Sequence, residues 1–151
     1  MGARERLAER GIELPAAPAP VASYVPVRVS GSLAFVSGMV PLEEGRPIVT
    51  GRVGEDVSVE EGAQAARRCA LQALAALEEA VGLDRVRGIV KVTAFVASAE
   101  GFTDQPKVAN GASDLFVEVF GEAGKHARAA VSSPSLPLGV PVEIEAIAEL
   151  G

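Results

Sequence analysis

The stretch SVEEGAQAARRCALQALAALEEAVG, residues 58–82, predicts a long helix that lies flat on a sheet. Ser58 followed by Glu61 fits a capping box, in which each side chain satisfies the free backbone N–H of the other residue. Alanine and leucine recur at helical spacing along one face, and Gly82 ends the pattern. Because alanine is small, this face lets the helix come close to a β-sheet.

Strand-like runs flank this helix on both sides. Upstream, residues 24–42 hold two short runs split by Ser30-Gly31, which predicts a hairpin, and Ile48–Thr50 is expected as a further short strand. Downstream, the sequence predicts a strand over 86–98, a helix over 104–121, and strands over Arg128–Ser132 and Val140–Glu149. Two helices among several strands predict an α+β two-layer sandwich, a mixed sheet with two helices on one face.

The length of 151 residues predicts a single domain, preceded by a short N-terminal extension over about residues 1–22. This extension begins with a helix over residues 3–10 and continues as the proline-rich LPAAPAPVA, which forbids a helix. No apolar run reaches the ~18 residues of a membrane span, and the start lacks a signal peptide. The single Cys69 cannot form an internal disulfide. We therefore expect a cytoplasmic protein without membrane contact.

Composition and the absence of known motifs exclude several kinds of binding site and catalytic centre. The net charge is −6, and no run of Lys or Arg is longer than the pair Arg67-Arg68, so a nucleic-acid partner is not expected. One His and one Cys cannot supply a usual transition-metal ligand set, and no Gly-rich nucleotide motif or GxSxG elbow occurs. We therefore expect neither a metal nor another cofactor.

The last two predicted strands carry two charged side chains of interest. If they form an antiparallel hairpin, residues whose numbers sum to ~271 face each other, which sets Arg128 opposite Glu143. An arginine fork suits a carboxylate ligand, and a nearby glutamate can orient a water or accept its proton. The alternative is an ordinary cross-strand ion pair, which the spacing alone favours.

A family resemblance bears on this choice. Four segments carry it, and they cover the chain from Tyr24 onward: SYVPVRVSGSLAFVSGMVPL, SVEEGAQAARRCALQAL, VKVTAFVAS and HARAAVSSPSLPLGVPVEIEAIAEL. They resemble the RidA/YjgF family of reactive-intermediate deaminases, also known as L-PSP endoribonuclease-like proteins. The resemblance implies a chorismate-mutase-like fold, assembled as a homotrimer with a cleft at each subunit interface. It implies hydrolysis of 2-imino acids such as 2-iminobutanoate and 2-iminopropanoate to 2-keto acids and ammonia.

The resemblance also assigns roles to individual residues. Arg128 matches the arginine that binds the substrate carboxylate, and Glu143 matches the acidic residue that positions the water. The remaining matched positions would line the cleft: Tyr24, Ser37, Gly38 and Asn110. The Asn110 match is shifted by one residue in its spacing to Arg128. His126 shares the face of Arg128 by strand parity but is not required by the motif, so it is expected at a surface or interface.

Two departures from the family pattern leave alternatives open. Ala130 stands where many members have a cysteine, and Met39 stands where a glutamine is frequent. These changes keep the carboxylate-binding arginine but leave the substrate undetermined. The alternative function is a trimeric binder of small carboxylates, such as 2-keto acids, without turnover. A ribonuclease is disfavoured by the acidic charge and by the absence of a paired acid and base.

Overall fold

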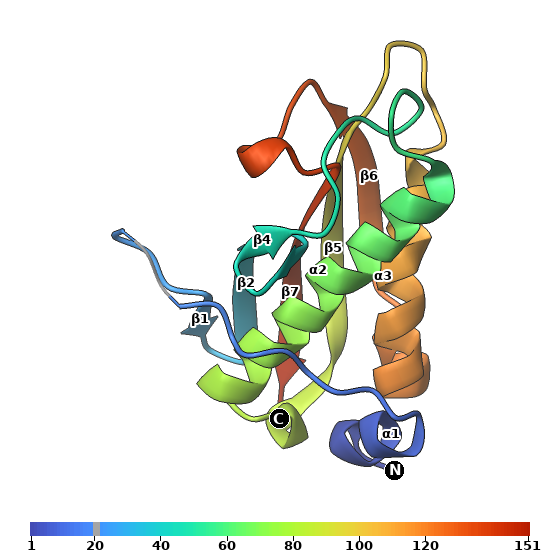
Figure 1. The fold of residues 1–151 in the computed structure, drawn as a ribbon. Helices are drawn as coiled ribbons and strands as arrows, with labels where there is room; N and C mark the ends of the chain where they lie inside the picture. The colour runs from blue at the N-terminus through green and yellow to red at the C-terminus, as the bar shows by residue number, and fades with distance from the viewer. Residues whose placement is uncertain (20–21) are drawn as a thin grey trace.

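Five strands form one mixed sheet, and the helices pack on one of its faces (Figure 1). The structure is a computed structural model that describes residues 1–19 and 22–151. The helices are α1 (Ala3–Glu9), α2 (Val59–Ala80) and α3 (Gln105–Phe120), with 3-10 turns at Leu83–Arg85, Gly121–Gly124 and Pro137–Gly139. The sheet strands are β1 (Val27–Ser30), β2 (Leu33–Met39), β5 (Val86–Ala97), β6 (Ala127–Ser133) and β7 (Val142–Leu150).

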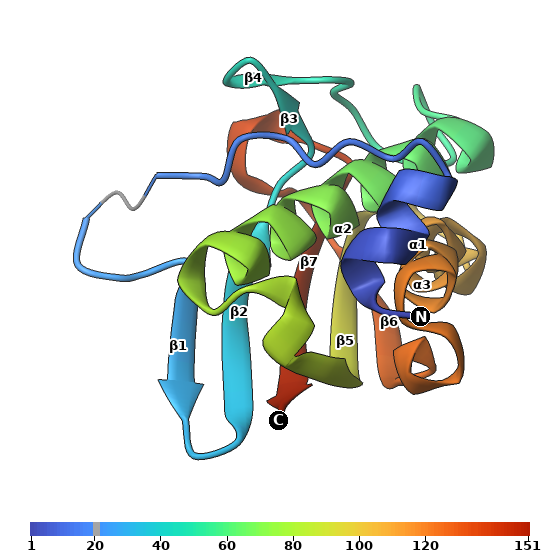
Figure 2. The same cartoon turned by 90° about the horizontal axis from the view of Figure 1, so that it is seen from below.

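The sheet order is β1-β2-β7-β5-β6. Strands β5 and β6 run parallel, because the connection through α3 returns the chain to the end of the sheet at which β5 begins. All other neighbouring strands of this sheet are antiparallel. This arrangement confirms the predicted α+β class with a mixed sheet and two long helices on one face. The small helix α1 contacts α3 at the periphery, as Figure 2 shows.

Helix α2 forms as its sequence predicts. The Glu61 backbone N–H donates to Ser58 Oγ at 3.1 Å, and the Ser58 N–H donates to Glu61 Oε1 at 3.1 Å, which completes the capping box. The alanine face and Cys69 are fully buried against the sheet. Gly82 adopts a φ of +80° just after the helix, a conformation that favours glycine.

The two faces of the sheet differ sharply in burial. In β7, the alternate residues Val142, Ile144, Ala146 and Ala148 are buried under the helices. The intervening side chains, which include Glu143 and Glu145, project from the other face. No helix in the described ranges covers this second face, which we call the open face. None of the described helices is long and apolar enough to cross a membrane.

One predicted strand is wrong. The chain at residues 48–50 is not a strand; instead β3 (Leu42–Glu43) and β4 (Arg46–Pro47) form a separate two-stranded ladder. The intervening turn has positive φ at Glu44 and Gly45, and the strand that follows it, β4, ends just before the predicted strand at residue 48. The predicted N-terminal helix occurs as α1, and the chain from residue 12 to residue 19 is non-helical as predicted; the predicted extended backbone at residues 20–21 lies outside the described residues.

Helices α2 and α3 approach closely at Gly111. A Cβ at this position would overlap the backbone carbonyl oxygen of Ala63, which cannot move without shifting α2. We expect Gly111→Ala to lower the free energy of unfolding by about 1–3 kcal/mol through overpacking, measured by urea denaturation. The exposed Asp114→Ala on the same helix is the control and should change stability by less than about 0.5 kcal/mol. Equal midpoints for both variants would contradict this packing.

Candidate functional site

Arg128 lies on β6, the edge strand of the sheet, and points to the helix side. Its sheet neighbour is Val92, which is buried under the helices. The Arg128 Nη1 donates to Asn110 Oδ1 at 2.8 Å and to Ser113 Oγ at 3.1 Å, both on α3. Asn110 and Ser113 are three residues apart and therefore share one face of the helix. We call Arg128, Asn110 and Ser113 the arginine half-site.

His126 contacts Ser113 of this half-site and does not contact Arg128 directly. Its Nδ1 lies 2.7 Å from the Gly124 carbonyl oxygen and its Nε2 lies 2.8 Å from Ser113 Oγ. A carbonyl only accepts, so Nδ1 carries the proton, and Nε2 of the neutral ring accepts from the Ser113 hydroxyl. Ser113 Oγ in turn accepts from Arg128. The ring also packs edge-on against Phe116, with 5.8 Å between centroids.

Glu143 lies on the opposite face. It is paired with Phe95 of β5 and projects from the open face of β7, half-buried beside Gly38. Its Oε1 lies 2.5 Å from the position that a Cβ on residue 38 would occupy, so a larger residue there would displace the Glu143 carboxylate. Burial, and then the charge of Glu145, raise the pKa of Glu143. A carboxyl group with a raised pKa is a better proton acceptor when ionised.

Ser37 and Gly38 form an irregularity in β2. The register with β7 shifts between Val36 and Met39, which is the signature of a β-bulge. The Ser37 hydroxyl donates to the Val25 carbonyl oxygen at 2.6 Å, so this side chain holds the segment that leads into β1. The bulge therefore places Gly38 beside Glu143, and the Ser37 hydroxyl donates its hydrogen bond to the Val25 carbonyl.

Tyr24 lies in that leading segment and is 54% exposed. It shares with Gly38 the lining of a cavity of about 640 Å³. We call Tyr24, Ser37, Gly38 and Glu143 the glutamate half-site. All four come from the β2 side of the sheet or from β7 beside it.

The predicted pairing of Arg128 with Glu143 is wrong. Strand β5 lies between β6 and β7, so the last two strands form no hairpin with each other. Arg128 is on the helix face and Glu143 is on the open face, so they do not form the predicted cross-strand ion pair. The structure brings Asn110 to Arg128, and Gly38 to Glu143, but it does not bring the two half-sites together in one protomer.

Two residues near Arg128 have contacts that the sequence analysis does not predict. Ser113 was not predicted, because a serine inside a helix carries no motif; its spacing of three from Asn110 is the available signal. His126, expected at a surface or interface, is half-buried and linked to Arg128 through Ser113. Among residues 1–19 and 22–151, no cluster of three or more His, Cys, Asp or Glu side chains could hold a metal ion.

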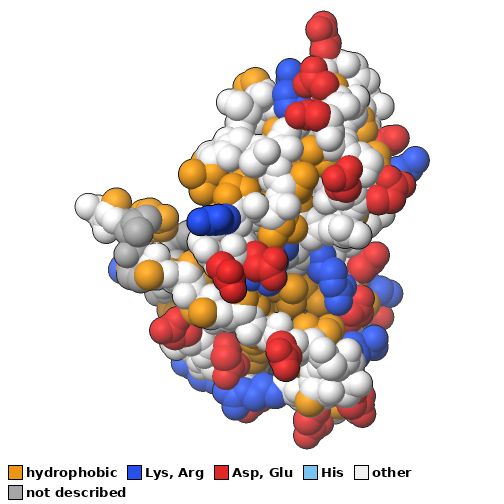
Figure 3. All heavy atoms as spheres, viewed as in Figure 1, with side chains coloured by type: hydrophobic (Ala, Val, Ile, Leu, Met, Phe, Trp, Pro, Cys, Tyr) orange, Lys and Arg blue, Asp and Glu red, His pale blue; other side chains and the backbone are white. Residues whose placement is uncertain are grey.

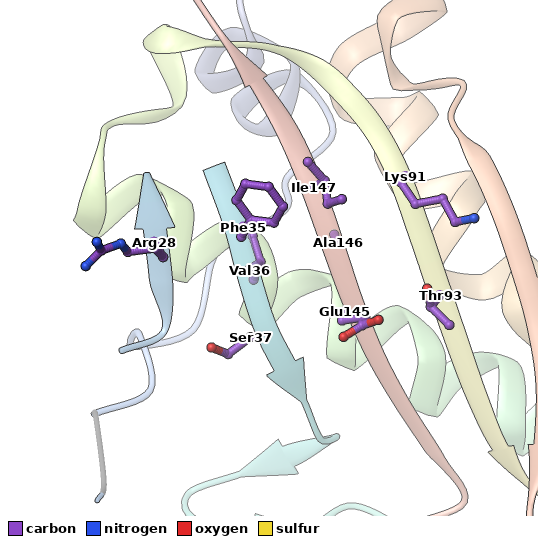
Figure 4. Close-up of a pocket in the computed structure, with 9 residues that line it drawn as sticks. All are labelled: Arg28, Phe35, Val36, Ser37, Lys91, Thr93, Glu145, Ala146 and Ile147. Atoms are coloured by element: carbon purple, nitrogen blue, oxygen red, sulfur yellow. The ribbon is translucent and has the colours of Figure 1, made fainter. Parts of the chain in front are cut away.

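A shallow hollow of about 300 Å³ lies on the open face (Figure 4). Phe35 and Ile147 form its apolar part, and Glu145 projects between Ser37 and Thr93. The helix face differs in character: acidic and basic side chains are interspersed over it, with apolar side chains exposed between them (Figure 3). The open face is thus partly apolar, and it is the face that carries Glu143.

The buried setting of His126 predicts a pH effect on stability. Burial, and the nearby Arg128 charge, lower the pKa of His126, although its hydrogen bond with Gly124 opposes the shift. Below about pH 6.5 the unfolded chain takes up a proton that the folded chain resists. The stabilisation is therefore full above that pH and is lost as the pH falls through the folded pKa. We expect the melting temperature to drop between pH 7.5 and 5.5, by less in His126→Gln. Identical drops would show that His126 does not contribute.

Comparisons with known proteins agree over nearly the whole chain. The YjgF/chorismate mutase-like family model matches residues 4–150. Protein TCP17 of Trypanosoma cruzi is 49% identical over 93% of this chain and 89% of its own length. The 2-iminobutanoate/2-iminopropanoate deaminase of Salmonella typhimurium is 38% identical over 87% of this chain and 91% of its own length.

Solved structures give the same fold. Atu1372 of Agrobacterium tumefaciens has a TM-score of 0.91 at 46% identity and covers 99% of this chain and 92% of its own. Escherichia coli TdcF with bound serine has a TM-score of 0.64 at 28% identity and covers 89% of this chain and 94% of its own. The family model and these relatives together show that the chain belongs to the YjgF/chorismate mutase-like family, the RidA/YjgF family that its sequence resembles.

Proposed function

We propose that the protein hydrolyses 2-imino acids to 2-keto acids and ammonia at sites formed between two copies of the chain. The observation that carries this proposal is the division of the candidate residues into two half-sites on opposite faces of one protomer. Each half-site has one part of the required chemistry, a carboxylate anchor or a proton acceptor. The family membership and the deaminase relative support the choice of reaction.

The arginine half-site is suited to a carboxylate. Within the described residues, Arg128 uses only Nη1 in hydrogen bonds, and none of its nitrogens forms an ion pair with an acidic side chain. Its Nε and Nη2 edge is therefore available for two parallel bonds to a ligand carboxylate. Asn110 and Ser113 fix the guanidinium plane, which lowers the entropy lost when the ligand binds.

The glutamate half-site is suited to water. The ionised Glu143 carboxylate can hold a water beside the Gly38 backbone and accept its proton as the oxygen attacks C2 of the imine. The resulting tetrahedral adduct carries a hydroxyl and an amino group on C2. Proton transfer to nitrogen then releases ammonia and forms the C2 carbonyl. One water is consumed per imine, and the net products are a 2-keto acid and ammonia.

A homotrimer would bring the two half-sites together. The arginine half-site lies at the β6 edge, whereas Tyr24 and the β2 bulge lie toward the β1 edge. A head-to-tail contact between these different edges is heterologous, and it forms a ring when its rotation closes. The open face supplies exposed apolar side chains for such an interface, including Phe35 at 41% and Val131 at 43%. The family resemblance supports three copies in this ring.

A charge on the open face should break this ring. We expect Val131→Asp, on the open face of β6, to sediment as a monomer and to lose imine hydrolysis, because the carboxylate would be buried without a partner. The control is Val29→Asp in β1, since Val29 is equally exposed at 42% but pairs with the buried Ala34 and lies on the other face. A native protein that already sediments with the mass of one chain would contradict the proposal.

The alternative is a carboxylate-binding protein without turnover, which the serine-bound structure of TdcF favours as a ligand-binding relative. The discriminating experiment generates imino acids with an amino-acid oxidase in a buffer free of nucleophiles. Hydrolysis faster than the uncatalysed rate supports the enzyme. Binding of 2-keto acids, together with imine hydrolysis that is no faster than the uncatalysed rate, supports the carboxylate-binding protein.

A further inference from the structure

The largest of the cavities described above has an N-terminal wall. Residues 15–19, which we call the strap, run from α1 across α2 toward β1 (Figure 2). Together with the end of β2, the β3–β4 turn and the Pro137–Leu138 turn, the strap encloses about 640 Å³. This size is within the range of small-molecule pockets in proteins.

The wall is mainly apolar. Its members include Pro15, Ala16, Met39, Val40, Leu42 and Leu138. Two polar side chains from α2 also border the cavity, but their polar atoms serve the backbone of the opposite wall. Gln72 Nε2 donates to the Val40 carbonyl at 2.7 Å, Gln72 Oε1 accepts from the Leu42 N–H, and Arg68 Nε donates to the Leu42 carbonyl at 2.5 Å. They fix the shape of the cavity.

The strap is anchored at its start. Helix α1 buries Ala3 and Leu7, and Ile12 and Leu14 pack against the core just before the strap. The prolines of the strap restrict its backbone dihedrals and exclude a helix. The wall is therefore held in place against α2.

The cavity shares two of its lining residues with the glutamate half-site. Gly38 and Tyr24 line it, and Gly38 lies beside the Glu143 carboxylate. Gly38 thus borders both the Glu143 carboxylate and the cavity, and a substituent that passes Gly38 reaches the cavity. We propose that the cavity receives the side chain of the imino acid, and that the preferred substrates carry large apolar side chains, branched aliphatic or aromatic. This inference rests on the proposed function and adds the substrate class.

The test compares imino acids that differ only in the side chain. We expect kcat/KM for leucine- and phenylalanine-derived imino acids to exceed that for the alanine-derived one by on the order of tenfold or more, since each buried methylene favours binding about fourfold. Ala16→Trp, which fills the cavity from the strap, should remove this preference by lowering kcat/KM for the leucine- and phenylalanine-derived imino acids. Ala8→Trp, at an exposed position on α1, is the matched control.

The outcomes separate the two proposals. Hydrolysis of all imines without a size preference, unchanged by Ala16→Trp, overturns the substrate class and leaves the proposed reaction standing. A preference for the glutamate-derived imine would also overturn it, because Arg68 would then act as an anion anchor. Hydrolysis of no imine overturns both.

Discussion

Arg128→Ala is expected to weaken 2-keto acid binding and to slow imine hydrolysis by about 2–4 kcal/mol, which is roughly 30- to 1,000-fold. The guanidinium supplies the only charge in the arginine half-site, and its Nε and Nη2 edge is not used by the described residues. Binding measured by calorimetry with pyruvate and 4-methyl-2-oxopentanoate reports the first effect, and kcat/KM reports the second.

Two further variants sharpen this result. Arg128→Lys keeps the charge but loses the planar fork and the contact geometry with Asn110, so it should not restore binding. Arg87→Ala removes an exposed arginine elsewhere on the sheet and should bind normally. If Arg128→Ala binds keto acids with unchanged affinity and only melts earlier, then Arg128 is structural.

Glu143→Gln is expected to separate binding from turnover. The amide keeps the shape beside Gly38 but cannot accept a proton, so kcat should fall by about 100-fold or more while keto-acid affinity is retained. Glu149→Gln, at an exposed position on the same face of β7, should leave kcat unchanged. Equal rates in Glu143→Gln and the native protein would remove Glu143 from the reaction.

The raised pKa of Glu143 also predicts how Glu143→Gln affects the melting temperature. A folded pKa above the unfolded value stabilises the fold below the unfolded pKa, and this contribution is lost as the pH rises through the folded pKa. At pH 7.5 the ionised group therefore opposes folding. We expect Glu143→Gln to melt no earlier than the native protein at pH 7.5, so a loss of kcat cannot be attributed to unfolding.

Local patterns predicted most of the elements. Helix α2 could be read from the capping box at Ser58 and Glu61 and from the alanine stripe, because both act within a few residues of the chain. The α+β class followed from the order of strands and helices. The short strand was misplaced, because a turn at Glu44-Gly45 outweighed the β-branched run at 48–50.

Strand pairing could not be read in the same way. The alternation in β6 and β7 predicts strands but does not specify partners, and the short Pro- and Gly-bearing connection between them favours a hairpin. The strand–helix–strand order of β5, α3 and β6 is the competing signal, since such units form parallel pairs. Because of that pairing, β5 lies between the strands that carry Arg128 and Glu143. The proposed site therefore needs residues from two protomers.

Complementation between two inactive variants tests the composite site most directly. Arg128→Ala and Glu143→Gln chains, carrying different affinity tags, are co-expressed in equal amounts, and the mixed oligomers are isolated through both tags. In each mixed trimer, about one third of the sites combine a native Arg128 from one chain with a native Glu143 from its neighbour. The proposal therefore predicts imine hydrolysis at about a third of the native rate. Mixed oligomers no more active than the two variants measured separately would contradict a site shared between protomers.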